Sequence, residues 1–169
     1  MERLSQLLCD PQCRLLTLVG PGGIGKTRFA IETASRMQDT FADGVYFVPL
    51  TSVNSTRFIV PVIADVIGFT FHYASDADPK TQLFSYLKEK QVLFRTDNLE
   101  HLLSSPGIEI LSELLTNALQ VHLLATSRES LYLQGEWIFE VHGLPVPENP
   151  QMEGFARAET VNVDCKIYS

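Results

Sequence analysis

The stretch that most restricts the fold of this chain is RLLTLVGPGGIGKTRFA, which begins at Arg14. Its apolar start has the length and composition of a buried strand, and the glycines that follow it end that strand. Gly20 and the tripeptide at 25–27 then satisfy G-x-x-x-x-G-K-[ST], in which backbone N–H groups of a glycine-rich loop surround a phosphate. After the loop, apolar residues recur at helical spacing. The stretch therefore predicts a strand, a phosphate-binding loop and a helix.

This loop is expected to hold the phosphates of a nucleotide. Lys26 should reach the outer phosphates, and the Thr27 hydroxyl should be a ligand of Mg²⁺. Guanine-specific phosphate-loop proteins generally carry Asn-Lys-x-Asp, which this sequence lacks, so ATP or ADP is the expected ligand. The predicted nucleotide-contacting residues of the loop are Gly20, Pro21, Gly22, Gly23, Ile24, Gly25, Lys26, Thr27 and Arg28.

Beyond the loop, short apolar runs alternate with amphipathic segments. Alternation of this kind predicts a parallel sheet with helices on both faces. We therefore expect an α/β chain with the three-layer P-loop NTPase fold and a mostly parallel sheet of about five strands. The expected strands are 14–19, 44–50, 91–97, 120–127 and 136–144, and the expected helices are 25–37, 56–69, 80–90 and 107–119.

Three local signals refine these boundaries. Asp78 is expected to cap the helix 80–90, with Pro79 at its first position. Pro61 should either kink the helix 56–69 or mark a late start. Prolines crowd into LPVPENP at 144–150, so residues 1–148 are expected to form the nucleotide-binding domain. Residues 149–169 are expected to begin a following helix or to form a disordered tail.

Asp97 follows the apolar run 91–96, where a carboxylate is expected to hold Mg²⁺ directly or through water. A helix N-cap for LEHLL is the competing role, and the two are compatible. Asn98 stands where many hydrolases of this kind carry a second acid, and an amide cannot take a proton from water. Hydrolysis should therefore be slow unless Glu100 reaches that water. The alternative for Glu100 is a first-turn acid favoured by the helix dipole.

Arg95 is unusual because strand alternation places it on the same face as Asp97. An unpaired guanidinium buried in a parallel sheet is costly. One hypothesis is that Arg95 pairs with Asp97 or another acid and weakens Mg²⁺ binding. The other is that Arg95 extends its charged end to the edge of the sheet.

Arg128 directly follows the expected strand 120–127, a position from which a cation reaches a terminal phosphate and reports its presence. We therefore count Arg128 among the nucleotide-binding residues. Thr126 and Ser127 are candidates for additional hydroxyl contacts. A solvated arginine without a partner is the alternative.

Composition excludes several classes of protein. A net charge of −7 and a pI near 5.0 argue against direct nucleic-acid contact by this chain, because such surfaces are usually strongly basic. The longest apolar runs are too short to span a bilayer and no signal peptide is visible, so a cytoplasmic location is expected. The three cysteines, Cys9, Cys13 and Cys165, are expected to be free thiols. The histidines His72, His101, His122 and His142 are expected to be structural or exposed.

Four stretches, RLLTLVGPGGIGKTRFA, DNLEHLL, LLATSRESL and GLPVPE, occur in that order over about residues 1–160. Together they resemble the nucleotide-binding core of the signal-transduction ATPases with numerous domains (STAND). Within that class they resemble the NB-ARC-like modules of large bacterial, LuxR-type transcriptional regulators. The resemblance implies ATP or ADP with Mg²⁺, phosphate and metal roles for Lys26 and Thr27, a metal role for Asp97 and a sensor role for Arg128. It also implies the other domains of a longer regulator as partners, with oligomerisation of the full-length protein left open.

The chain departs from this family at two points. The family's strand before the aspartate is apolar, whereas this one carries Arg95 and Thr96. The sequence also stops before the helical and winged-helix subdomains that close over ADP in the family, and the GLP at 143–145 is given no ligand role. We expect a nucleotide switch with slow Mg²⁺-dependent hydrolysis at most. The alternatives are a catalytically inactive interaction module that retains ADP, or a small-molecule phosphotransferase, for which no acceptor-binding lid is evident.

Overall fold

A six-stranded sheet forms the centre of the molecule, with strand order β2-β3-β4-β1-β5-β6. The computed structural model describes residues 2–51, 53, 56–72, 76–103 and 106–142, and the backbone of residues 165–167. The first five strands are parallel, so the predicted sheet is confirmed. Their bounds are β1 (Leu15–Val19), β2 (Val45–Val48), β3 (Val92–Thr96), β4 (Val121–Ser127) and β5 (Glu136–Glu140).

The sixth strand, β6 (Cys165–Ile167), pairs antiparallel with β5. It comes from the segment 149–169, for which the sequence predicted the start of a helix or a tail. The predicted boundary at residue 148 and the GLP at 143–145 lie outside the described residues.

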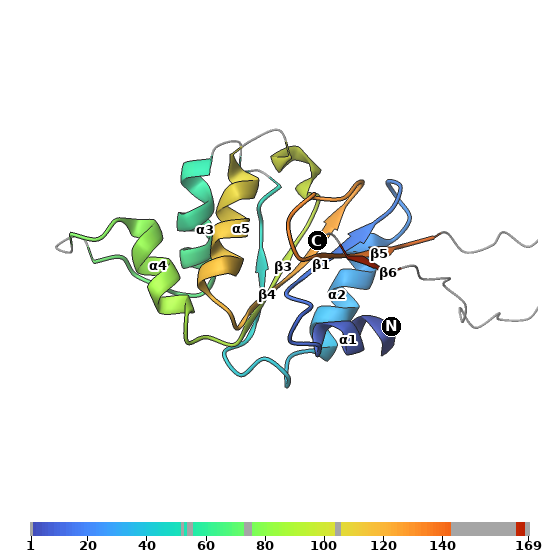
Figure 1. Cartoon of the computed structure of the whole chain (residues 1–169), viewed down its shortest axis with the longest axis horizontal. Coiled ribbons are helices and arrows are strands. Elements are labelled where there is room, and N and C mark those ends of the chain that lie inside the picture. The colour runs from blue at the N-terminus through green and yellow to red at the C-terminus, as the bar shows by residue number, and fades with distance from the viewer. Residues whose placement is uncertain are drawn as a thin grey trace, which may run out of the picture.

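Helices cover both faces of the sheet and make three layers (Figure 1). One face carries α3, α4 and α5, and the other carries α1 and α2. The α-helices are α1 (Glu2–Leu8), α2 (Lys26–Arg36), α3 (Ile59–Val66), α4 (Pro79–Leu87) and α5 (Gly107–Asn117), and two short 3₁₀ helices are η1 (Thr56–Phe58) and η2 (Leu99–Leu102).

Alternation along the strands explains why each strand reads as a continuous apolar run. In β3, Phe94 packs into the core beneath α3, α4 and α5, whereas Leu93 packs beneath α1 and α2. The same division separates Leu123 from Leu124 in β4. Both faces of a covered parallel sheet are buried, so both sets of positions favour apolar side chains.

The predicted helix signals are confirmed where the structure describes them. The Asp78 carboxylate accepts hydrogen bonds from the backbone N–H groups of Lys80 and Thr81, and Pro79 is the first residue of α4. Pro61 lies in the first turn of α3, which begins after η1, so the late start is the correct alternative. Helix α1 was not predicted, although Leu4 and Leu8 lie one turn apart on its buried face.

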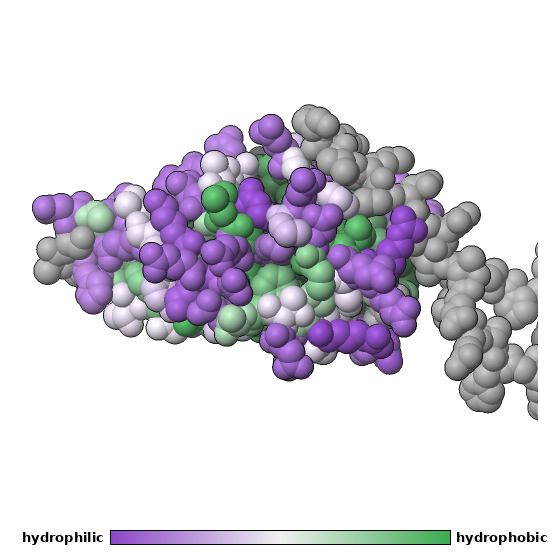
Figure 2. Space-filling model, turned by 60° about the horizontal axis from the view of Figure 1, so that its bottom comes forward, coloured by the Kyte–Doolittle hydropathy of each residue, from purple (hydrophilic) through white to green (hydrophobic). Residues whose placement is uncertain are grey.

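Figure 2 shows one face on which polar side chains predominate and apolar ones gather in small groups. Within the described residues, no helix combines the length and the hydropathy needed to cross a membrane. Cys9 is an exposed free thiol as expected, and Cys13 is buried. The side chain of Cys165 lies outside the described residues.

Candidate functional site

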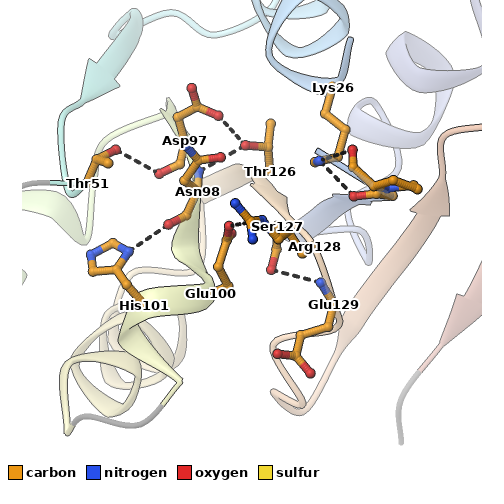
Figure 3. A network of polar contacts seen from close by, with 12 residues as sticks. Lys26, Thr51, Asp97, Asn98, Glu100, His101, Thr126, Ser127, Arg128 and Glu129 are labelled. Atoms are coloured by element: carbon orange, nitrogen blue, oxygen red, sulfur yellow. Dashed lines mark hydrogen bonds and ion pairs between the residues drawn. The ribbon is translucent and has the colours of Figure 1, made fainter. Parts of the chain in front are cut away.

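The phosphate-binding loop connects β1 to α2, as the sequence predicted. Gly25 stands at the N-cap of α2 with φ of 97°, a left-handed conformation that favours glycine. The almost fully buried Lys26 turns back over the loop, where its Nζ donates hydrogen bonds to the carbonyl oxygens of Gly20 (2.7 Å) and Pro21 (3.0 Å). Figure 3 shows these two bonds. The ammonium group therefore lies within the curve of the loop.

A cavity of about 780 Å³ opens beside this loop, a size typical of small-molecule sites. A Cβ atom added at Gly22, Gly23 or Gly25 would meet no protein atom within 4 Å. Such an atom would stand in the cavity, so these glycines leave room for a ligand beside the backbone. The lining residues are Gly22, Gly23, Gly25, Lys26, Thr27, Arg28, Ile31, Glu32, Asn98 and Arg128.

Gly20 has a different role. A Cβ atom there would lie 2.7 Å from the carbonyl oxygen of Val141, because β5 runs directly beside β1. Gly20 therefore permits close packing of two chain segments. Gly20, Pro21 and Ile24 do not line the cavity, so the structure places only part of the predicted loop against it.

The two predicted metal ligands lie together. The Thr27 hydroxyl is 3.0 and 3.1 Å from the two carboxylate oxygens of Asp97, although 70 residues separate them in the sequence. In the described residues no cluster of three or more His, Cys, Asp or Glu side chains forms a metal site. One hydroxyl and one carboxylate are oxygen donors that suit Mg²⁺, which usually takes few protein ligands together with phosphates and water.

Thr126 supports this carboxylate. Its hydroxyl donates to Oδ1 of Asp97 and accepts a hydrogen bond from the backbone N–H of Asn98 at 3.0 Å (Figure 3). Arg95 of β3 pairs with Leu124 of β4. Two residues further along both chains, the same register brings Asp97 beside Thr126. Thr126 was a candidate for an additional hydroxyl contact at the nucleotide, whereas in the structure its hydroxyl donates to Asp97.

The backbone after Asp97 is fixed on two sides. Asn98 has φ of 52°, and its carbonyl oxygen is 2.6 Å from Nδ1 of His101. The other ring nitrogen of His101, Nε2, is 2.9 Å from the carbonyl oxygen of Leu50. His101 is thus structural, as expected, and joins the end of β2 to the turn. The N-cap residue of η2 is Asn98, and its side chain makes no capping hydrogen bond. Asp97 is therefore not the N-cap that the sequence analysis considered.

Arg95 does not pair with Asp97. In the described part of the chain, no acid lies within ion-pair distance of its guanidinium; instead that group lies 4.1 Å from the ring centre of Phe47. Phe47 belongs to β2, which is an edge strand, and is 45% exposed. Burial lowers the pKa of the half-buried Arg95 from its usual value, and the charge of Asp97 acts in the opposite direction. Arg95 therefore extends its charged end toward the edge of the sheet, as the second hypothesis stated. Its cation–π contact with Phe47 was not predicted.

Arg128 and Glu100 form an ion pair. Arg128 Nε lies 3.2 Å from Oε1 of Glu100, and the two side chains point toward one another in Figure 3. Their predicted roles were separate: a sensor for Arg128, and either a base or a first-turn acid for Glu100. Ser127 accepts a hydrogen bond from the backbone N–H of Glu129 at 3.3 Å and does not line the cavity.

Two lining residues were missed by the sequence analysis. Ile31 and Glu32 follow Thr27 and Arg28 by four residues each, so they lie on the same face of α2. Helical spacing from the motif was the signal that could have identified them.

Sequence comparison finds relatives but no matching family model. A candidate HTH-type transcriptional regulator of Mycobacterium tuberculosis (strain ATCC 25618 / H37Rv) is 31% identical over 137 residues, which make up 81% of this chain and 15% of that protein. An uncharacterized protein of the same strain is 29% identical over 168 residues, or 99% of this chain and 41% of that protein. The chain thus spans a small part of the length of the first of these relatives.

Two solved structures are similar in fold. The Aeropyrum pernix Orc1 protein, solved in complex with DNA, superposes with a TM-score of 0.58 and 18% identity, over 77% of this chain and 38% of that one. Cdc6p from Pyrobaculum aerophilum gives a TM-score of 0.54 and 17% identity, over 76% of this chain and 38% of that one. At these identities the likeness concerns the fold alone. The sheet order, the layers and the loop between β1 and α2 agree with it: the chain has the three-layer α/β fold of P-loop nucleoside triphosphatases.

Proposed function

We propose that this chain is an ATP- or ADP-binding domain that works as the nucleotide switch of a longer signal-transduction regulator. The observation that carries the proposal is the contact between Thr27 and Asp97 beside a glycine-lined cavity that also holds Lys26. A cation, a hydroxyl and a carboxylate meet there at the N-terminus of α2, which favours anions. This set of groups suits a magnesium nucleotide.

Each of these residues has a separate task. Lys26 neutralises phosphate charge, and the backbone N–H groups of the loop donate hydrogen bonds to phosphate oxygens. Thr27 and Asp97 would hold Mg²⁺, with Thr126 fixing the carboxylate. Bound Mg²⁺ would supply charge stabilisation for the phosphates.

Turnover is expected to be slow. Asn98 lines the cavity but has no group that takes a proton at neutral pH. Glu100, the other candidate base, has one carboxylate oxygen paired with Arg128 and the other buried. A base in this position would have to leave the ion pair before it could accept a proton from water. The domain is therefore proposed to change state mainly with the nucleotide that it holds.

The regulatory part of the proposal rests on the mycobacterial relative. That protein is a candidate HTH-type transcriptional regulator, and this chain matches a portion of it. We infer that the domain controls an output carried by other parts of a longer protein. An ADP-retaining module without hydrolysis remains the alternative function.

Calorimetric titration with ATP, ADP and GTP, each with Mg²⁺, tests the binding proposal. We expect binding of both adenine nucleotides, weaker binding of GTP, and loss of binding in Lys26→Ala. Lys88→Ala, which removes an exposed lysine at the end of α4, is the matched control and should bind like the wild type. Equal behaviour of the two lysine variants would contradict the proposal. Single-turnover hydrolysis with and without Mg²⁺ then separates a slow ATPase from the inactive module.

A further inference from the structure

Arg128 lies where three strand ends meet. The register between β1 and β4 pairs Val19 with Ser127, so Gly20 at the start of the loop is beside Arg128. The register between β3 and β4, continued in the same way, brings Arg128 next to η2, which carries Glu100. The parallel strands therefore place Arg128 between the phosphate-binding loop and Glu100.

The ion pair uses only part of the guanidinium. Glu100 Oε1 contacts Nε of Arg128, and the described residues accept no hydrogen bond from its two terminal nitrogens. The side chain of Arg128 is 72% exposed and lines the cavity with Lys26 and Asn98. An arginine presents its N–H donors in a rigid fork, so engagement at Nε leaves the edge formed by Nη1 and Nη2 for another anion.

Glu100 is itself held firmly. Its side chain is only 22% exposed, and its second oxygen is buried without a hydrogen-bond partner in the described residues. It lies in η2, whose first residues are fixed through Asn98 and His101. A long exposed arginine loses considerable rotamer freedom when it binds a ligand. A fixed carboxylate that restrains it beforehand reduces that loss.

We propose that Glu100 is a positioning residue that holds Arg128 by its Nε so that the terminal N–H groups face the outermost phosphate of ATP. The inference rests on the proposed function. It assigns to Glu100 a task other than proton transfer, and it makes the ion pair a determinant of selectivity for ATP over ADP. ADP has no third phosphate, so its binding does not use Arg128.

The test is a titration of the wild type and five variants with ADP and with a non-hydrolysable ATP analogue, both with Mg²⁺. The variants are Glu100→Ala, Glu100→Gln, Arg128→Ala, the double variant Glu100→Ala/Arg128→Ala, and the control Glu129→Ala. Glu129 is an exposed acid next to Arg128 whose side chain makes no contact with the site. Thermal unfolding of each variant checks that it is folded.

Glu100→Ala is expected to weaken binding of the ATP analogue about threefold to fivefold, the effect of an exposed ion pair. Binding of ADP should stay unchanged. Glu100→Gln should retain most of the preference, because an amide oxygen at the same place is an acceptor toward which Nε of Arg128 can donate. In the Arg128→Ala background, removal of Glu100 should have no further effect, and Glu129→Ala should behave like the wild type.

Three results would overturn the inference while leaving the proposed function intact. Binding of the ATP analogue could be unchanged in Glu100→Ala, or weakened equally for both nucleotides, which would indicate a structural role. It could also become tighter, which would mean that Glu100 competes with phosphate for Arg128. If the wild type binds neither nucleotide, the proposed function itself fails.

Discussion

Substitution of a loop glycine allows nucleotide binding in the cavity to be tested separately from the stability of the fold. Gly22→Ala adds a methyl group that meets no protein atom within 4 Å, and Gly22 does not have a left-handed backbone. Gly68→Ala adds a methyl group that is equally free of contacts, but Gly68 has φ of +70° and follows α3, away from the cavity lining. The two variants therefore differ in backbone strain and in location.

Their expected effects run in opposite directions. At Gly68 the left-handed conformation costs a non-glycine residue about 1–2 kcal/mol, which lowers the melting temperature by roughly 2–8 °C for a chain of this size. At Gly22 alanine should leave the stability unchanged or raise it slightly, by reducing the freedom of the unfolded chain. The methyl group added by Gly22→Ala would stand in the cavity beside the phosphate-binding loop. There it should displace phosphate from at least one charge-assisted hydrogen bond, worth about 1.5–3 kcal/mol. Nucleotide affinity should fall about tenfold or more.

Thermal unfolding without nucleotide and calorimetric titration with ATP measure the two effects independently. Gly68→Ala should melt earlier and bind ATP like the wild type, whereas Gly22→Ala should melt no earlier and bind ATP poorly. Wild-type ATP affinity in Gly22→Ala would show that the phosphates do not lie over this glycine. The free space beside Gly22 would then not be a phosphate site.

Three further predictions concern other residues. Glu136 is fully buried and accepts hydrogen bonds from Ser130 Oγ (2.7 Å) and the Leu131 N–H (2.9 Å); Glu136→Gln should cost about 1–3 kcal/mol in chemical denaturation by disrupting this set. Burial holds the pKa of His122 below its usual 6.5. The neutral imidazole therefore stabilises the fold fully above about pH 6.5, and progressively less as the pH falls below that value. His122→Phe should make the melting temperature depend less on pH between pH 8 and 5. Asn98→Asp introduces a proton acceptor beside the cavity and should raise the rate of single-turnover hydrolysis by a factor of about 10²–10⁴, the usual range for general base catalysis; an unchanged rate would remove Asn98 as the cause of slow turnover.

The sequence predicted the sheet and the motif because both depend on local patterns. Each of the five parallel strands is a short apolar run bounded by turns, and the phosphate-binding loop has fixed spacing. Helix α1 and strand β6 escaped prediction because they are short, with seven and three residues, and contain little periodicity. Their positions depend on packing against α2 and β5.

Contacts that depend on strand order were the ones missed. Sequence alone predicted that Thr27 and Asp97 bind the same Mg²⁺, which agrees with the rule that the carboxyl ends of parallel strands share one edge of the sheet. It did not show that β3 lies between β2 and β4, and this order is what gives Asp97 its contact with Thr126 and Arg95 its contact with Phe47. The pair formed by Arg128 and Glu100 depends on the same order.

Strand order also changes the expected cause of the slow turnover that we propose. One of the two hypotheses for Arg95 was that it weakens the metal site by pairing with Asp97, but Arg95 lies against the ring of Phe47 and the carboxylate is instead bound by two hydroxyl groups. Hydroxyl donors orient a carboxylate without cancelling its charge, so Asp97 keeps the negative charge that attracts Mg²⁺. The effect of Arg95 on the metal is then limited to a charge acting at longer range, which solvent and salt reduce. For the proposed Mg²⁺-dependent switch, we therefore expect metal affinity to be largely preserved, and removal of a proton from water beside Asn98 to limit hydrolysis.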